Sequence, residues 1–186
     1  MVKILCFCGD FSEDYEVMVP YQALEIAGHE VHMVCPDKKK DDTIQTAVHD
    51  FLPGLQFYHE SEGHKFKLNF SFDDVKPENY DALYIPGGRA PEYLRYNQKV
   101  IDIVNHFIKE NKPICAVCHG VLLLAATNNI KGRQLTGFYT TQKDLENAGA
   151  VYDGKNEEKV DGNIVTGQSY LSHVPMIKEF LKLLKK

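Results

Sequence analysis

Residues 112–120 of the chain read KPICAVCHG, and six apolar residues, VLLLAA, follow at 121–126. The apolar run before Cys118 predicts a short buried strand that turns at this cysteine directly into a helix. Such a turn crowds the positions two before and two after the turning residue, and here small residues, Ala116 and Gly120, occupy them. The stretch therefore predicts a strand–elbow–helix unit with Cys118 at its tip.

The tip position suggests chemistry for Cys118. We expect the elbow to strain its backbone and to hold its side chain clear above the sheet, exposed at a helix start that favours the thiolate. The alternative is an ordinary buried cysteine, since free cysteine is among the most buried residue types. Cys115 completes a C-x-x-C pair, but two strand positions three apart lie roughly 10 Å from each other. A disulfide spans about 7 Å at most, so a thioredoxin-like redox pair is not expected.

Composition sets the class of protein. The chain has 186 residues, of which 44% are hydrophobic, and we expect residues 1–186 to form one domain. No apolar run reaches the roughly 18 residues that a membrane span needs, and residues 1–8 are too short for a signal peptide. Five cysteines suggest no disulfide framework, so we expect a cytoplasmic protein. A net charge of −5 argues against nucleic acid or a membrane as partner.

Apolar runs alternate with helical patterns along the chain. We expect strands at 2–8, 29–36, 81–85 and 114–117, helices at 15–26, 97–110, 121–126, 141–148 and 173–184, and a hairpin at 160–164. Pro20 should break or kink the first helix. Alternating pieces at 46–51 and 66–72 predict a β excursion off the main sheet within 43–74. This order predicts an α/β fold with a mostly parallel central sheet and helices on both faces.

Three turns of the chain come directly after predicted parallel strands. They are Gly9 to Glu16, Pro86 to Glu92, and the elbow at Cys118. Because working sites in such folds lie outside the carboxyl ends of the strands, we expect these turns to converge on one site. Their convergence favours a nucleophile at Cys118 over a merely buried cysteine.

The same residues resemble a known family. The motifs IPGGRAPE at 85–92 and CHG at 118–120, with an acid at 14–16, are similar to those of the PfpI-like proteins. These proteins are intracellular cysteine peptidases, protein deglycases and glyoxalase III enzymes. They belong to the class I glutamine-amidotransferase-like superfamily. Residues 46–51, with EGH at 62–64, resemble the glyoxalase III branch. The resemblance implies a flavodoxin-like three-layer sandwich, no metal and no cofactor. Segment 166–175 departs from the family pattern, so the resemblance does not define the residues at the rim of the pocket.

The resemblance also implies roles for individual residues. Cys118 would be the nucleophile, and Glu16 the carboxyl that hydrogen-bonds its sulfur, with a pKa raised by burial and by the nearby thiolate. His119 would pair with an acid at Glu92 that arrives from a neighbouring subunit. The backbone of Gly88 and His119 would form an oxyanion hole beside Gly87. The implied pocket histidines are His49 and His173.

Three activities remain open at this stage. The first is glutathione-independent conversion of methylglyoxal or glyoxal to a hydroxy acid, with deglycation of early adducts as a related reaction on small reactive carbonyls. The second is a cysteine peptidase that uses Cys118, His119 and Glu92. The third is a redox sensor or chaperone whose only chemistry is oxidation of Cys118. A shared Glu92 implies a homo-oligomer, either a dimer, a trimer or a hexamer.

Overall fold

A computed structural model describes residues 1–185 and contains a six-stranded central sheet. Its strand order is β2-β1-β5-β6-β10-β9, in which only β9 is antiparallel to its neighbour. The strands of the sheet are β1 (Lys3–Phe7), β2 (Glu30–Val34), β5 (Ala82–Ile85), β6 (Ile114–Val117), β9 (Glu158–Asp161) and β10 (Ile164–Gly167). The predicted strands and the hairpin at 160–164 are therefore confirmed.

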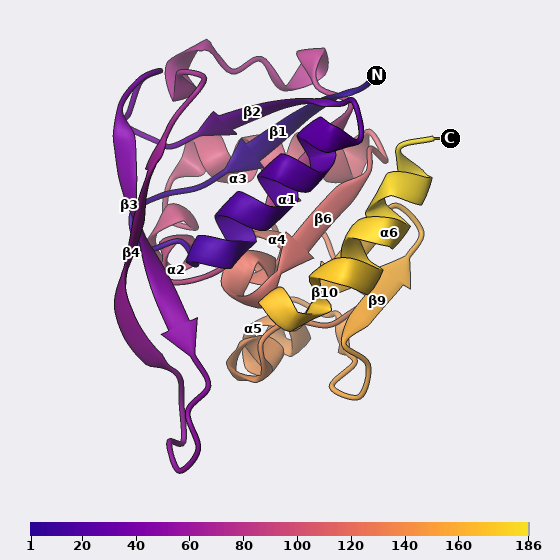
Figure 1. Cartoon of the computed structure of the whole chain (residues 1–186). Helices are drawn as coiled ribbons and strands as arrows, with labels where there is room; N and C mark the ends of the chain where they lie inside the picture. Colours follow the sequence, from indigo (N-terminus) through magenta and orange to yellow (C-terminus); the bar gives the residue numbers. More distant parts are fainter. Residues whose placement is uncertain (186) are drawn as a thin grey trace.

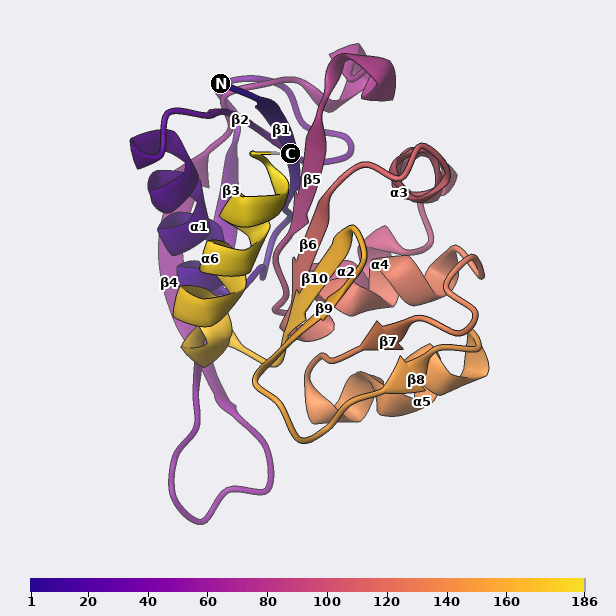
Figure 2. The same cartoon turned by 90° about the vertical axis from the view of Figure 1, so that its right-hand side faces the viewer.

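Helices cover both faces of this sheet, as Figure 2 shows. α1 (Asp14–Ile26) and α6 (His173–Leu183) lie on one face, and α2 (Ala90–Leu94), α3 (Gln98–Lys109) and α4 (Val121–Ala126) lie on the other, with α5 (Gln142–Asn147) beyond α4. Within residues 1–185, no helix is long and apolar enough to cross a membrane. The three-layer α/β sandwich predicted from the sequence is confirmed.

The alternation of side chains along each strand builds the two cores. In β1, Leu5 and Phe7 belong to the core under α3 and α4, whereas Ile4 and Cys6 belong to the core under α1 and α6. Successive side chains of a strand point to opposite faces, so a strand that is covered on both sides must be apolar throughout. This explains the near-continuous apolar run at the start of the chain.

The β excursion is a long antiparallel hairpin beside the main sheet. It consists of β3 (Thr43–Asp50) and β4 (His59–Lys67), and its connecting loop projects from the body of the protein (Figure 1). The first predicted piece, 46–51, falls largely in β3. The second prediction, a strand at 66–72, is wrong because β4 is mostly solvent-exposed and therefore polar. The apolar side chains after it instead anchor the chain in the core at Leu68 and Phe72.

Pro20 does not break the first helix, because α1 runs through this residue without interruption. Proline lacks the N–H that would bond the carbonyl four residues earlier, which is that of Glu16. The buried hydroxyl of Tyr84 donates a hydrogen bond to this carbonyl at 2.9 Å. A side chain of β5 thus satisfies the group that proline leaves free, and the helix continues.

Smaller elements complete the fold. Two short strands, β7 (Gln134–Leu135) and β8 (Val151–Tyr152), pair in parallel next to α5. Single 3-10 turns lie at Phe72–Asp74, Pro77–Asn79, Cys118–Gly120, Tyr139–Thr141 and Tyr170–Ser172. The turn at 118–120 is the elbow between β6 and α4.

Candidate active site

The three predicted turns meet at the carboxyl ends of β1, β5 and β6. The N–H of Glu13 donates to the carbonyl of Gly87, and the N–H of Arg89 donates to that of Phe11 at 2.8 Å. Gly88 adopts a φ of 73°, and a Cβ there would overlap the backbone of residues 11–13. Glycine is therefore required where the first two turns cross.

The elbow has the strained geometry that the sequence predicts. Cys118 has a φ of 56°, in the left-handed region that residues with a Cβ rarely adopt. A Cβ on Gly120 would overlap the carbonyl of Ile85, so the elbow packs directly against the end of β5. Cys115 lies in β6, and both cysteines are free thiols.

The expectation of an exposed Cys118 is wrong, because the residue is only 4% exposed. Burial raises the pKa of its thiol, and the charge of Glu16 raises it further. The backbone N–H groups of Gly88 and His119 hydrogen-bond the cysteine and act in the opposite direction. The thiolate therefore depends on these two donors and on a neutral Glu16, not on exposure to water.

Glu16 lies against the cysteine as the resemblance implies. Its carboxylate accepts the N–H of Gly87 at 2.7 Å and is hydrogen-bonded to Cys118. A Cβ on Gly87 would lie 2.6 Å from both Cys118 Cβ and Glu16 Oε2, so only glycine allows this approach. Burial, and then the charge of Glu13, raise the pKa of Glu16 well above its usual range. Burial therefore favours the neutral carboxyl, which is the form that can donate a hydrogen bond to sulfur.

Sequence reasoning missed Glu13, the second buried acid of the site. Its carboxylate accepts the N–H of Glu16 at 2.9 Å and those of Tyr15 and His49. Burial raises the pKa of Glu13 to about 7 despite these three hydrogen bonds. An acid directly before a helix usually serves as its N-cap, so the sequence carries no signal of a second function.

His119 contacts the nucleophile within the same chain. Its Nδ1 lies 3.3 Å from Cys118 Sγ, and its Nε2 lies 3.3 Å from Thr140 Oγ1. Burial lowers the pKa of His119 to about 4, so the ring is neutral at pH 7. Phe138 and Tyr58 pack against this ring, with centroids 5.1 and 6.4 Å away.

Glu92 does not contact His119 within this chain. It faces Arg89, with Glu92 Oε2 3.9 Å from Arg89 Nε. A Cys118–His119–Glu92 triad therefore requires Glu92 of another subunit, as the resemblance implies, and this arrangement stays a prediction.

The two pocket histidines differ in their surroundings. His49 lies beside Glu13 in a cavity of about 160 Å³, and its Nε2 bonds Glu60 at 2.8 Å. His173 begins α6, is 5% exposed, and lies outside the residues that line this cavity. Burial lowers the pKa of His173 to about 4, and its Nε2 has no hydrogen-bond partner in the described part of the chain.

Two further residues reach the site from segments without a recognisable motif. Tyr58 comes from the loop of the β3–β4 hairpin, and Tyr170 donates its backbone N–H to Glu16. Such long-range contacts depend on how the hairpin and the turn before α6 fold over the sheet. Among residues 1–185, no group of three or more His, Cys, Asp or Glu residues could hold a metal ion.

Comparisons with known proteins agree with this geometry. The family described as DJ-1/PfpI matches residues 2–183. The chain is 47% identical over 184 residues to protein DJ-1 homolog D of Arabidopsis thaliana, covering 97% of this chain and 47% of that protein. It is 34% identical over 184 residues to the deglycase PfpI of Pyrococcus furiosus, covering 99% of this chain and 100% of that protein. The chain thus spans about half the length of the Arabidopsis relatives it matches.

Solved structures share the fold. A two-domain protein of Anabaena variabilis with DJ-1/ThiJ/PfpI-like and ferritin-like domains has a TM-score of 0.82 and 26% identity, covering 100% of this chain and 48% of its own. The DJ-1 protein of Schizosaccharomyces pombe has a TM-score of 0.78 and 22% identity, covering 99% of this chain and 90% of its own.

Proposed function

The chain belongs to the DJ-1/PfpI family, and from this premise we propose that it is a glutathione-independent glyoxalase with a related deglycase activity. Its substrates would be methylglyoxal, glyoxal and their early adducts on proteins. The observation that carries the proposal is the buried Glu16 carboxyl, hydrogen-bonded to the Cys118 side chain and held by the N–H of Gly87. The deglycase name of the Pyrococcus furiosus relative supports chemistry on carbonyl adducts.

The first step forms a bond between Cys118 sulfur and the aldehyde carbon. The carbonyl oxygen becomes an oxyanion that the N–H groups of Gly88 and His119 can hold, since both already face the sulfur. Glu16 gives its proton to this oxygen, which forms a hemithioacetal and leaves a carboxylate that can act as the base in the next step. These N–H donors stabilise the thiolate before the attack and the oxyanion after it.

The second step moves a proton between neighbouring carbons. A base removes the hydrogen from the former aldehyde carbon, and the same group returns a proton to the adjacent carbon, which leaves a thioester. Water then cleaves the thioester to lactate and the free thiol, so methylglyoxal gains one water overall. Glu16 suits this role because its raised pKa brings a carboxyl closer to the working pH.

A cysteine peptidase is the second candidate, favoured by the contact between His119 Nδ1 and Cys118 Sγ at 3.3 Å. Peptide hydrolysis requires a protonated His119 at the leaving group, whereas burial lowers the pKa of this ring to about 4. In the described chain the acid Glu92 faces Arg89. Both observations favour the glyoxalase over the peptidase.

An assay of the purified protein against methylglyoxal and an unfolded peptide tests the proposal. We expect lactate from methylglyoxal without glutathione, no peptide cleavage, and loss of lactate formation in Cys118→Ser. Peptide cleavage that depends on Cys118, without lactate formation, would identify the peptidase instead. A protein inactive on both substrates would leave oxidation of Cys118 as the remaining chemistry.

A further inference from the structure

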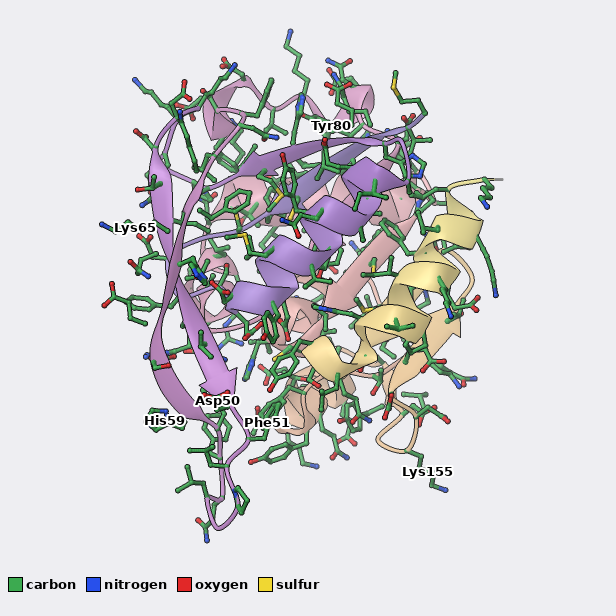
Figure 3. The ribbon with its side chains drawn as sticks, in the orientation of Figure 1. Asp50, Phe51, His59, Lys65, Tyr80 and Lys155 are labelled. Atoms are coloured by element: carbon green, nitrogen blue, oxygen red, sulfur yellow. The ribbon has the colours of Figure 1, made fainter. Side chains whose placement is uncertain are left out.

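A cavity of about 160 Å³ lies between the start of α1 and the β3–β4 hairpin. Glu13, His49, Asp50 and Tyr170 contribute to its walls. Two of these residues contact Glu16, since Glu13 accepts its N–H and Tyr170 donates to its carboxylate. Figure 3 labels Asp50 at the end of β3, where the projecting loop begins.

His49 presents an unused hydrogen-bond acceptor in this region. Its side chain is 2% exposed, and its Nε2 lies 2.8 Å from Glu60 Oε2. Burial lowers the pKa of His49, so the ring is neutral at pH 7. A carboxylate only accepts, which places the hydrogen on Nε2 and leaves a lone pair on Nδ1. Nδ1 is buried and has no partner among the described residues.

The surroundings of His49 hold its ring in this orientation. His49 and Glu60 are directly opposed on β3 and β4. The other carboxylate oxygen of Glu60 accepts from Arg89 Nη1 at 3.3 Å. The ring also stacks on Tyr58, with centroids 3.8 Å apart and planes inclined by 16°. Glu60 is thus a positioning residue that fixes which nitrogen of His49 accepts.

Charged groups around the ring are consistent with this assignment. Besides Glu60, the charges that act on His49 are Arg89 and Glu92, and the carboxylate of Glu13 binds the His49 backbone N–H. None of these three is a hydrogen-bond partner of Nδ1. Its lone pair therefore remains available to a donor that enters the cavity.

We propose that this cavity is a subsite for a hydroxyl group of the substrate, read by His49 Nδ1. The inference rests on the proposed glyoxalase function and names its substrate class as 2-oxoaldehydes with a hydroxyl on the third carbon. Such a hydroxyl donates to Nδ1, whereas the methyl of methylglyoxal leaves a buried acceptor unpaired. A site built to bond a hydroxyl discriminates against the analogue that lacks it.

Kinetics with two substrates that differ by one hydroxyl test this subsite. We expect kcat/KM for 3-hydroxy-2-oxopropanal to exceed that for methylglyoxal by roughly 5- to 30-fold, the equivalent of one hydrogen bond. His49→Phe keeps an aromatic ring on Tyr58 but deletes Nδ1, so the ratio should fall to about one. Glu60→Gln should keep part of the preference, because either tautomer of His49 can bond a hydroxyl, which both donates and accepts.

Matched controls are His59→Phe and Glu62→Gln, which alter exposed residues of β4 and should keep the wild-type ratio. Thermal midpoints like that of the wild type show that each variant is folded. A wild-type ratio of one or less, or a wild-type ratio that survives in His49→Phe, would overturn the subsite.

Binding to Cys118→Ser separates the subsite from the proposed function. Hydroxyacetone and acetone also differ by one hydroxyl, and neither has an aldehyde to react. We expect hydroxyacetone to bind more tightly and to shift the ¹⁵N resonance of His49 Nδ1 in an NMR titration. This preference without turnover of either aldehyde would keep the subsite and discard the glyoxalase. Turnover with equal binding and a ratio of one would keep the glyoxalase and discard the subsite.

Discussion

Opposing effects on one thiol decide the reactivity of Cys118. Burial and the charge of Glu16 raise its pKa, whereas the N–H groups of Gly88 and His119 lower it. The sequence alone suggested the donors, through the elbow and the helix start. It could not show that the hairpin loop and Phe138 would close over His119 beside the cysteine.

We expect Cys118 to react with limiting iodoacetamide before the other four cysteines. Those four are also buried, and burial dominates the raised pKa of each. Only the Cys118 thiolate is stabilised by the Gly88 and His119 N–H groups among the cysteines of the described chain. Site-resolved mass spectrometry measures the order of labelling. Labelling led by another cysteine, or uniform labelling, would contradict the elbow as the source of reactivity.

The buried His173 leads to a prediction about how the stability of the protein depends on pH. The unfolded histidine binds its proton near pH 6.5, whereas burial lowers the folded pKa to about 4. Between these values the unfolded state binds more protons, so stability falls as the pH falls. This one residue should account for about 2 kcal/mol of lost unfolding free energy between pH 7 and pH 5. Urea unfolding at both pH values should show a smaller loss in His173→Leu.

The exposed His59 provides the control for this experiment. His59→Gln should keep the wild-type difference between pH 7 and pH 5. An unchanged difference in His173→Leu would show that the ring is not buried as a neutral group.

At the scale of elements, α1 depends on a side chain from another part of the fold. Tyr84→Phe removes the hydroxyl that satisfies the Glu16 carbonyl and should destabilise the protein by about 1–3 kcal/mol, the cost of an unpaired buried acceptor. Pro20→Ala restores the N–H inside the helix and should reduce this cost. A double-mutant cycle from urea unfolding measures the coupling. Equal effects of Tyr84→Phe in both backgrounds would disprove the compensation.

The elements that the sequence predicts well are those with a single strong signal. Apolar runs mark the buried parallel strands, and the small residues around Cys118 mark the elbow. The sequence misplaced β4 because a strand exposed on both faces carries no apolar alternation. The sequence could not show that α1 continues through Pro20, because the compensating Tyr84 lies 64 to 68 residues away along the chain.

The residues of the candidate site also fall into two groups, those that the sequence could predict and those that it could not. Cys118, Glu16, Gly87 and Gly88 belong to three turns that the order of strands brings together, and these could be predicted. Glu60 and Tyr58 lie on the hairpin, outside the main sheet. Their positions depend on the pairing of β3 with β4, and the apolar pattern predicted the second strand of this pair too late in the chain.

At the scale of the whole molecule, the Glu92 prediction requires an oligomer. If Glu92 of another subunit orients His119, then Glu92→Gln should lower kcat/KM at least about tenfold without much change in the thermal midpoint. Analytical ultracentrifugation at the assay concentration measures the state of assembly. Glu78→Gln, in an exposed 3-10 turn, serves as a control. A fully active monomer would contradict the shared site.

The central claim is that Glu16 carries the proton in a reaction on the Cys118 adduct. The most direct test is the rate of lactate formation from methylglyoxal by Glu16→Gln, without glutathione. Glutamine can still accept the Gly87 N–H but cannot act as a base, so we expect a loss of ~100- to 10,000-fold. The variant should still gain the mass of one methylglyoxal at Cys118. Lactate formation at the wild-type rate would contradict the account.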